Sequence, residues 1–411
     1  MSDTAASYNV GGVKLARPFR ALRLGHFGWN YRDSQAALHF YADLLGLIVS
    51  DEENFAHILQ VEGEDIGDPM GYFLRYGHDH HAFVLFPYKA FAKSPRAPKH
   101  PGLETVSHIA WQVGTLREVT DAQAWLKERQ IPIQRSGRDA LGSNWQFAFP
   151  DPDRLGNELY YGMDQIGWDG ASKPFTMVDF SGVKLPEKPI GGDFREVVKH
   201  LKDRNIDPRD GMHVRPEAEA KYNVGDVMLP RPFRIMRHGP VRMFVDDVAR
   251  ATRWYQEVIG LALTEEAEWR GHRCTFLRVN TEHHSVAIYP KALRAELPLD
   301  QACNCMAYGM QLGSYQQLRD GIAFLEENGV TIKYLPPELF PGIDYSAFAI
   351  DPDGHAIQLY YYMEQIGWDG QPRPASQRRK IENYSGWAHW PESLDALPDT
   401  YLGQVFQGPL G

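Results

Sequence analysis

Apolar and polar residues follow one order along the chain: an extended segment, an amphipathic helix, then several more extended segments. Leu22–Tyr31 has the character of a strand. Asp33 then offers a helix N-cap, apolar residues recur at helical spacing, and Gly46 suits a left-handed helix end. Strand-like runs follow, such as Gly71–Arg75 and Ala82–Phe86. These elements predict a βαβββ unit.

A second unit with the same order of elements begins about eighty residues later. Its first strand is Val106–Val113, and the helix that follows has an apolar face around Val119 and Trp125. Trp145–Phe149 and Asn157–Gly162 close the unit as two strands around a proline-containing turn. We expect the two units to pair into one curved mixed sheet, which gives an α+β fold.

The whole arrangement then recurs about two hundred residues further on, so the chain is an internal duplication. Tyr8–Gly11 recurs as Tyr222–Gly225, and Gln165–Gly170 recurs as Gln365–Gly370. Each copy is long enough to bury its own hydrophobic core. The sequence therefore predicts two similar domains in tandem.

The duplication divides the chain into four predicted segments. Residues 1–170 form the first domain, 171–220 a connection rich in Lys, Pro and Asp, 221–370 the duplicated domain, and 371–411 a C-terminal arm. The arm carries several aromatic residues, and we expect it to pack against the protein because so much aromatic surface is unusual in a free linker. These residues are Trp387, Trp390, Tyr401 and Phe406.

Composition narrows the function classes. The chain has 411 residues, 43% of them hydrophobic, and a net charge of -10. An acidic balance without a basic stripe argues against nucleic acid binding. The chain shows neither a signal-peptide pattern nor an apolar run that could span a bilayer. Cys274, Cys303 and Cys305 are too few for a disulfide scaffold, so we expect reduced, structural thiols rather than a metal site, in a cytoplasmic protein.

The two copies differ at three corresponding strand positions, where only the first copy has side chains that could bind a metal. The first copy has His26, His108 and Glu158, whereas the second copy has residues that cannot form a metal site: Pro240, Ala307 and Gln358. Taken singly, each of the three is most simply an ordinary strand residue in a chain with 16 histidines. Their joint presence in one copy and joint absence from the other favours a metal site. Two histidines and a carboxylate form the facial arrangement of non-haem Fe(II) oxygenases, although Zn, Ni and Mn accept the same ligand types.

With these candidate ligands in both units of the first copy, the chain resembles the vicinal oxygen chelate superfamily and, more narrowly, the type I extradiol ring-cleavage dioxygenases. The resemblance covers about residues 20–165 and 234–365. It is carried by His26, His108, the segment Phe73–Arg75 leading into His80 and His81, and Asp151–Asp153 running into Glu158–Tyr160. It implies that each domain is a curved mixed-sheet barrel around a central cavity, with helices outside.

The resemblance also implies a role for each site residue. Fe(II), or alternatively Mn(II), would be held by His26, His108 and Glu158, and His81 would be the acid/base histidine. Tyr160 lies two residues beyond Glu158 on the same side of the strand, so we expect it to hydrogen-bond beside the metal. The reactants would be an aromatic diol and dioxygen, and we expect a homo-oligomer.

Some residues depart from the family pattern. Two-domain extradiol enzymes usually hold the metal in the second copy, whereas here the first copy has the ligands. A tyrosine common ten residues before the glutamate is replaced by Ala148, and an upstream histidine is matched by Asp139, a candidate substrate contact. The pair His283 and His284 persists in the copy without ligands, which leaves a structural role for such a pair open.

The leading prediction is an Fe(II)-dependent extradiol dioxygenase that opens a catechol-type ring in aromatic catabolism. One alternative is another metal-dependent enzyme of the superfamily, such as an isomerase, lyase or hydrolase. A second alternative is a small-molecule binding or resistance protein, which would not need a metal.

Overall fold

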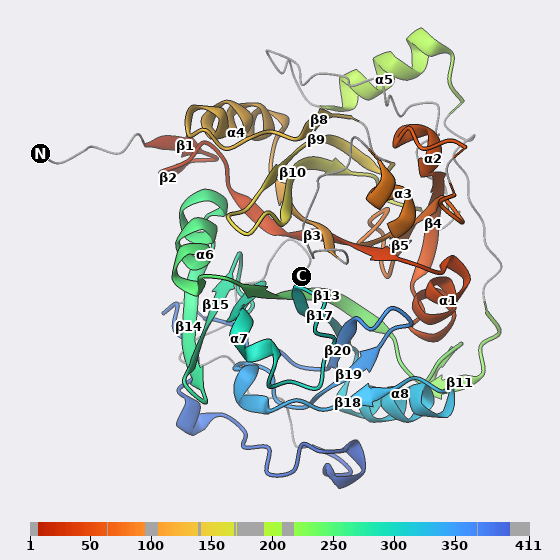
Figure 1. Cartoon of the computed structure of the whole chain (residues 1–411), viewed down its shortest axis with the longest axis vertical. Helices are drawn as coiled ribbons and strands as arrows, with labels where there is room; N and C mark the ends of the chain where they lie inside the picture. The colour runs from red at the N-terminus through yellow and green to blue at the C-terminus, as the bar shows by residue number, and fades with distance from the viewer. Residues whose placement is uncertain are drawn as a thin grey trace, which may run out of the picture.

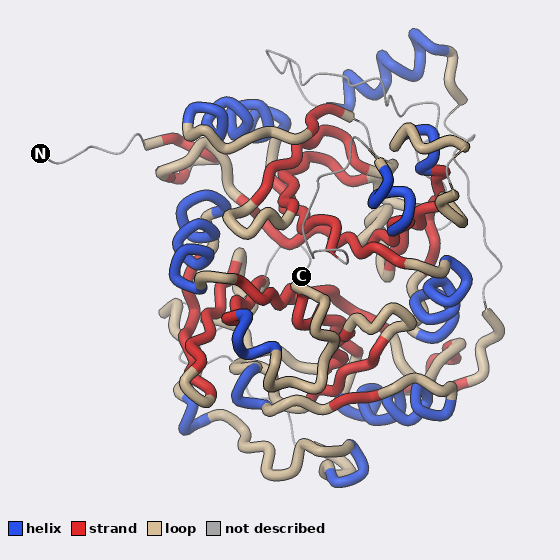
Figure 2. The backbone as a smooth tube through the Cα atoms, viewed as in Figure 1, coloured by secondary structure: helices blue, strands red, loops and turns tan. Residues whose placement is uncertain are grey.

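A computed structural model describes residues 7–63, 65–94, 106–138, 141–167, 170, 193–207, 218–367 and 369–394. Two curled, eight-stranded mixed sheets dominate it, one from each copy (Figure 1). Strands gather in the interior of each half and the longer helices lie outside (Figure 2). The prediction of an α+β fold built from tandem βαβββ units is confirmed.

The first sheet has the strand order β4-β5-β6-β3-β7-β10-β9-β8. Its strands are β3 (Ala21–Tyr31), β4 (Ile48–Asn54), β5 (Met70–Arg75), β6 (Phe83–Pro87), β7 (Val106–Val113), β8 (Arg135–Gly137), β9 (Ser143–Pro150) and β10 (Gly156–Met163). β3 and β7, the first strands of the two units, pair antiparallel and join the units at the middle of the sheet.

The second sheet repeats this topology in the order β14-β15-β16-β13-β17-β20-β19-β18. Its strands are β13 (Ile235–Val245), β14 (Ala262–Trp269), β15 (His272–Arg278), β16 (Val286–Pro290), β17 (Cys305–Leu312), β18 (Ile332–Lys333), β19 (Ser346–Ile350) and β20 (Ala356–Tyr360). Two-stranded hairpins precede the sheets: β1 (Tyr8–Val10) with β2 (Val13–Leu15), and β11 (Tyr222–Val224) with β12 (Val227–Leu229).

The helices follow the first strand of each unit or fill connections. They are α1 (Ser34–Leu38), α2 (Phe55–Ile58), α3 (Tyr88–Lys93), α4 (Leu116–Glu128), α5 (Asp193–Arg204), α6 (Val248–Trp254), α7 (Lys291–Arg294) and α8 (Tyr315–Glu327). π-helical turns η1 (His39–Leu44) and η4 (Tyr255–Ile259) continue α1 and α6. Short 3-10 turns are η5 (Pro337–Leu339), η6 (Ala375–Gln377) and η7 (Trp387–His389).

The helix predicted after Asp33 is present, but its second half is wound more widely than an α-helix. The Asp33 carboxylate accepts hydrogen bonds from the backbone N–H groups of Gln35 and Ala36, as an N-cap does. Leu45 N–H donates to the carbonyl of Phe40, five residues back, which is the π-helical pattern. Gly46 then has the left-handed φ of 86° expected at the helix end.

The two π-helical turns contribute to a reciprocal contact between the copies. Tyr41, in η1, donates to the Asp351 carboxylate at 2.8 Å, and Tyr255, in η4, donates to the Asp151 carboxylate at 3.0 Å. Each aspartate opens the Asp-Pro-Asp turn of the opposite copy. The recurrence of these motifs in the sequence therefore reflects an interface that uses each of them twice.

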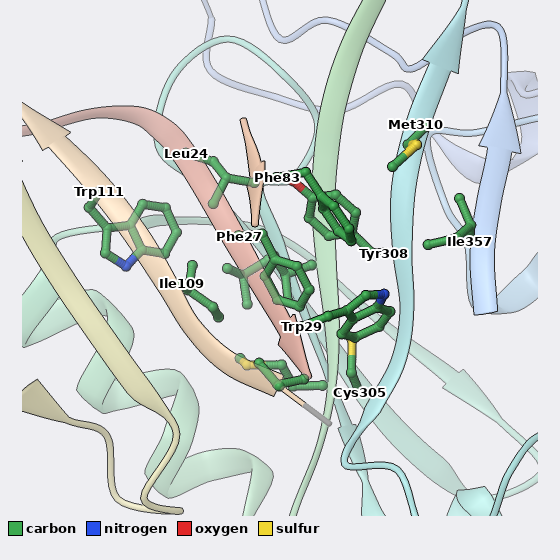
Figure 3. Packing of buried hydrophobic residues seen from close by; sticks show 14 of the residues in the cluster. Leu24, Phe27, Trp29, Phe83, Ile109, Trp111, Cys305, Tyr308, Met310 and Ile357 are labelled. Atoms are coloured by element: carbon green, nitrogen blue, oxygen red, sulfur yellow. The ribbon is translucent and has the colours of Figure 1, made fainter. Parts of the chain in front are cut away.

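Aromatic stacking continues the hydrophobic core across this interface (Figure 3). Phe27 on β3 stacks on Tyr308 on β17 with ring centroids 4.3 Å apart. Trp29 stacks on the buried His355 at 4.2 Å. Because β3 also carries a candidate metal ligand, packing of the second copy bears directly on the strand that positions the site.

The described part of the C-terminal arm packs on the second copy. Trp390 is buried beside the rings of Tyr345, Tyr334 and Tyr315. Arg378 forms two hydrogen bonds with the Glu265 carboxylate, at 2.9 and 2.6 Å. Tyr401 and Phe406 lie outside the described residues, as does most of the predicted connection 171–220.

No helix among the described residues combines the length and the apolar content needed to cross a membrane. The three cysteines are buried and form no disulfide.

Candidate metal centre

Three neighbouring strands bring the predicted ligands onto one face of the first sheet. His26 on β3 and Glu158 on β10 both lie opposite Ala110 of the central strand β7. His108 is two residues before Ala110, so its side chain points to the same face. The small side chain of Ala110 leaves room between the three donors.

The donor atoms converge to distances that suit one cation. His26 Nε2 lies 3.1 Å from His108 Nε2 and 3.4 Å from Glu158 Oε1. All three ligand atoms lie within 4.8 Å of one another. Two ligand atoms about 2.1 Å from a metal ion and at right angles to each other lie about 3 Å apart. The spacing therefore fits adjacent positions of a facial triad.

Burial and mutual charge keep two of these groups in the unprotonated form that metal binding requires. Burial lowers the pKa of His108 to about 3, against the opposing effect of the Glu158 carboxylate. Burial on its own would raise the pKa of Glu158, but contact with His26 and the charge of Arg135 outweigh it and bring that pKa to about 2. At neutral pH the centre offers a neutral imidazole and a carboxylate.

Partners outside the triad orient two of the ligands and leave one atom for a cation. Ser107 Oγ lies 3.1 Å from His108 Nδ1, the nitrogen that faces away from the triad. Arg135 donates to Glu158 Oε2 at 2.6 Å. Glu158 Oε1 is buried and, apart from the 3.4 Å contact with His26 Nε2 inside the triad, has no hydrogen-bond donor among the described residues. A buried carboxylate oxygen without a donor is costly, and a bound cation would satisfy it.

His81 lies directly beside the triad. Its ring centroid is 4.5 Å from that of His26, and the side chain is buried. Burial, with the nearby His26, His80 and His108, lowers its pKa well below the ordinary value. Among its described neighbours it contacts His80, whose Nδ1 lies 3.0 Å from His81 Nδ1.

Of the other two site residues predicted from the sequence, the structure describes Tyr160. The ring of Tyr160 lies 5.2 Å from that of His26, beside the triad as expected. Its buried hydroxyl has no hydrogen-bond partner among the described residues, so the expected hydrogen bond to a metal ligand is not formed. A Cβ at Gly25 would lie 1.9 Å from that hydroxyl, so this position requires glycine. Asp139 lies outside the described residues.

In the second copy a buried arginine lies near the positions that correspond to the triad. Arg242 occupies the register position of Gly28 and is fully buried. It donates from Nη2 to His284 Nε2 at 3.2 Å. Gln358, at the Glu158 position, donates to Ser346 Oγ at 3.0 Å. A guanidinium therefore places a positive charge in the second copy close to where the first could hold a metal.

Sequence reasoning missed Arg242, Arg135 and Asp51. Arg242 could have been noticed, because it is a charged residue in a strand whose neighbours are apolar on both sides. Arg135 and Asp51 become visible only in the folded protein, where Arg135 donates to Glu158 and Asp51 lies 3.2 Å from His80, the neighbour of His81.

A second group of potential donors, Asp351, Asp353 and His355, belongs to the interface between the copies. His355 Nδ1 lies 2.8 Å from Asp351 Oδ2, which also accepts from Tyr41. Arg32 donates to the Asp353 carboxylate at 3.2 Å. These contacts account for the group as part of the interface.

Comparison with solved structures identifies the same fold. A catechol 2,3-dioxygenase matches with a TM-score of 0.51 and 18% identity, over 90% of this chain and 98% of that one. The Mn(II)-bound glyoxalase from Novosphingobium aromaticivorans matches at 0.52 and 16%, over 85% of each chain. A variant of homoprotocatechuate 2,3-dioxygenase from Brevibacterium fuscum matches at 0.53 and 16%, over 86% and 75%.

Sequence comparison gives the family. No curated protein is a significant match. The family model described as Glyoxalase/Bleomycin resistance protein/Dioxygenase superfamily matches residues 23–159 and 237–359, once in each copy. The chain therefore belongs to the Glyoxalase/Bleomycin resistance protein/Dioxygenase superfamily, the vicinal oxygen chelate proteins.

Proposed function

We propose that the protein is an Fe(II)-dependent extradiol dioxygenase that opens the ring of a catechol-type aromatic with dioxygen. Mn(II) is the alternative metal. The observation that carries the proposal is the facial set of His26, His108 and Glu158, in which the buried carboxylate oxygen Oε1 has no hydrogen-bond donor outside the set among the described residues. A facial set leaves cis positions for a chelating diol and for dioxygen.

When bound, the metal would supply Lewis acidity toward the diol and a site for dioxygen. Side chains of the protein would transfer the protons and hydrogen-bond the substrate. His81, neutral and beside His26, would accept a proton from the diol hydroxyl and return one later. The buried Tyr160 hydroxyl would donate a hydrogen bond to the bound substrate, because no described residue accepts one from it.

The second candidate function is a metal-dependent isomerase of the same superfamily. It is favoured by the structural similarity to a Mn(II)-bound glyoxalase. The donor set argues for the dioxygenase: among the described residues, Glu158 is the single carboxylate grouped with the two histidines. A non-enzymatic binding role is disfavoured because it requires no such triad. The three buried cysteines form no disulfide, which is consistent with the cytoplasmic setting that we propose.

Anaerobic purification and reconstitution with Fe(II), Mn(II) or Zn(II) would separate these functions. Oxygen uptake should then be measured over a panel of catechols, together with the absorbance of the ring-opened product. Stoichiometric iron, oxygen consumption and a yellow product are expected. Full turnover of a substrate with Zn(II), without oxygen uptake, would instead support the isomerase.

A further inference from the structure

A chain of three buried side chains leads from β4 to the candidate metal centre. Asp51 Oδ2 lies 3.2 Å from His80 Nε2, and His80 Nδ1 lies 3.0 Å from His81 Nδ1. All three residues are at most 5% exposed. The contacts follow the order carboxylate, imidazole, imidazole, and the last ring lies beside His26.

The surrounding backbone fixes the middle ring of this chain. His80 N–H donates to the carbonyl of Asp164 at 2.8 Å, and Asp164 N–H donates to the carbonyl of Gly142 at 2.8 Å. Gly142 has a φ of 72°, and a Cβ there would lie 2.2 Å from His80 Cγ. Because the site demands glycine against the imidazole, His80 has little freedom to turn.

The second copy repeats this series of contacts with two additions, one of which is Arg378 Nη2, 3.2 Å from His283 Nε2. His283 Nε2 lies 3.0 Å from Glu265 Oε2, and His283 Nδ1 lies 3.0 Å from His284 Nδ1. At the far end, Arg242 Nη2 lies 3.2 Å from His284 Nε2.

These end groups determine where the protons lie. An arginine only donates, so His284 Nε2 must accept, and a neutral His284 then carries its proton on Nδ1. That proton points to His283 Nδ1, so His283 carries its own proton on Nε2 and donates to Glu265. The Glu265 carboxylate only accepts, and its Oε2 lies 3.0 Å from His283 Nε2 and 2.6 Å from Arg378 Nη2. The 3.2 Å between these two nitrogens is thus the spacing of two donors around one oxygen, and both ends require the same arrangement.

The first copy has the carboxylate of this series of contacts, Asp51, but has a glycine, Gly28, at the position of Arg242. The Asp51 carboxylate accepts from His80 Nε2, which leaves His80 Nδ1 as the acceptor for His81 Nδ1–H. His81 Nε2 is then an unprotonated nitrogen. Gly28 occupies the position from which Arg242 reaches His284, so in the first copy no side chain comes from there toward this nitrogen.

We propose that Asp51 and His80 are positioning residues that hold His81 as its Nδ1–H tautomer, with the Nε2 lone pair directed at the substrate position. The catalytic meaning of this arrangement rests on the proposed function. In the step it prepares, one O–H bond of the diol breaks and an N–H bond forms at His81 Nε2, which gives an imidazolium and the monoanion of the diol. His81 is thus set as a proton acceptor before substrate binds.

The tautomer can be read without turnover by ¹⁵N NMR of histidine-labelled protein, metal-free and loaded with Zn(II). Loss of a signal in His81→Gln assigns it. We expect wild-type His81 with the proton on Nδ1 and Nε2 unprotonated, and a proton on Nε2 would overturn the proposal. In Asp51→Asn, whose amide can also donate to His80, His81 should lose its single tautomer. Retention of the pure Nδ1–H form would reject the positioning role.

The second copy supplies a matched control. Glu265→Gln makes the equivalent change at a carboxylate that also pairs with Arg378. Arg242 still holds His284 from its other side, so the His284 tautomer should not change. With iron bound, Asp51→Asn should lower kcat about 100-fold and leave metal content and KM near wild type, whereas Glu265→Gln should leave kcat unchanged. If no catechol is cleaved, the proposed function fails, and the NMR result still decides the tautomer.

Discussion

Arg135 reaches the carboxylate of Glu158 across Ala148. The three residues lie in one row over the adjacent strands β8, β9 and β10, with Ala148 paired to both of the others. Arg135 Nη2 lies 2.6 Å from Glu158 Oε2. A bulky side chain at position 148 would stand between the two. The alanine that departs from the family pattern therefore accompanies an arginine partner for Glu158, the proposed metal ligand, and this partner leaves Oε1 open to the proposed cation.

Replacing Arg135 by methionine should weaken metal binding about tenfold, because the carboxylate loses the contact that orients it. Titration of metal-free protein with Fe(II) or Zn(II) would measure this. Arg135 also helps to lower the pKa of Glu158, so the deficit of the variant should grow as the pH falls. Arg117→Met, which removes an exposed arginine on α4, is the control. Tighter binding by Arg135→Met would show that repulsion between the guanidinium and the metal outweighs the orientation.

Removal of one histidine ligand should abolish stoichiometric metal binding. In His108→Ala we expect the metal content measured by elemental analysis to fall to background, while circular dichroism shows an intact fold. Gln358→Ala, at the corresponding ligand position of the second copy, should keep the wild-type metal content. Stoichiometric iron retained by His108→Ala would rule out the assignment.

Gly28 should tolerate no side chain without loss of metal. A Cβ there would lie 2.8 Å from Phe86 Cε2 and 3.2 Å from His108 Cε1 and Nδ1. Gly28→Ala should therefore displace the His108 ring, weaken metal binding and cost about 1–3 kcal/mol of unfolding free energy. Gly77→Ala, where a Cβ meets nothing within 4 Å, should change neither metal affinity nor the denaturation midpoint. Equal metal affinity in the two variants would contradict this account.

The predicted ligands could be found in the sequence because strand alternation and the contrast between copies are both local patterns. His26, His108 and Glu158 occupy the first or last strands of their units, which the hydrophobic pattern marks clearly. The contacts of Asp51 and Arg135 depend instead on which strands pair and in which register. Apolar periodicity does not specify that register.

The interface between the copies could not be predicted from the sequence pattern either, although the motifs that form it were visible as repeats. Tyr41 could be read as one more apolar position of an amphipathic helix. Its hydrogen bond to Asp351 depends on how the opposite copy docks and on the π-helical turn that carries it. A repeated motif shows that two copies share a constraint, but not that each motif meets the other copy.

The buried Asp151 carboxyl group at the same interface should make the unfolding free energy of the protein depend on pH. Burial raises the pKa of Asp151 to about 7, against the lowering effect of its hydrogen bonds. A raised carboxyl pKa means that the folded state holds the proton more tightly than the unfolded chain. Its contribution is therefore complete below about pH 4 and is lost as the pH rises to about 7, at most about 4 kcal/mol. Asp151→Asn should remove this component, so that its unfolding free energy gains on wild type between pH 5 and pH 8. Parallel curves for the two proteins would contradict the shift. The exposed Asp121→Asn is the control.

Replacement of the buried Arg242 guanidinium of the second copy by an apolar side chain should leave the candidate metal centre of the first copy intact. Among the described residues, Arg242 forms no ion pair, and its Nε and Nη1 lack hydrogen-bond partners. Its guanidinium lies 5.1 Å from the centroid of the Phe340 ring. Desolvation of an unpaired charge is expensive, and an apolar side chain of similar volume avoids it. Arg242→Met should therefore unfold at equal or higher denaturant concentration than wild type, by up to about 3 kcal/mol, with metal content and turnover unchanged. A large loss of stability would show that the contact with His284 organises the second copy, and a loss of metal would show that the two copies are coupled through their interface.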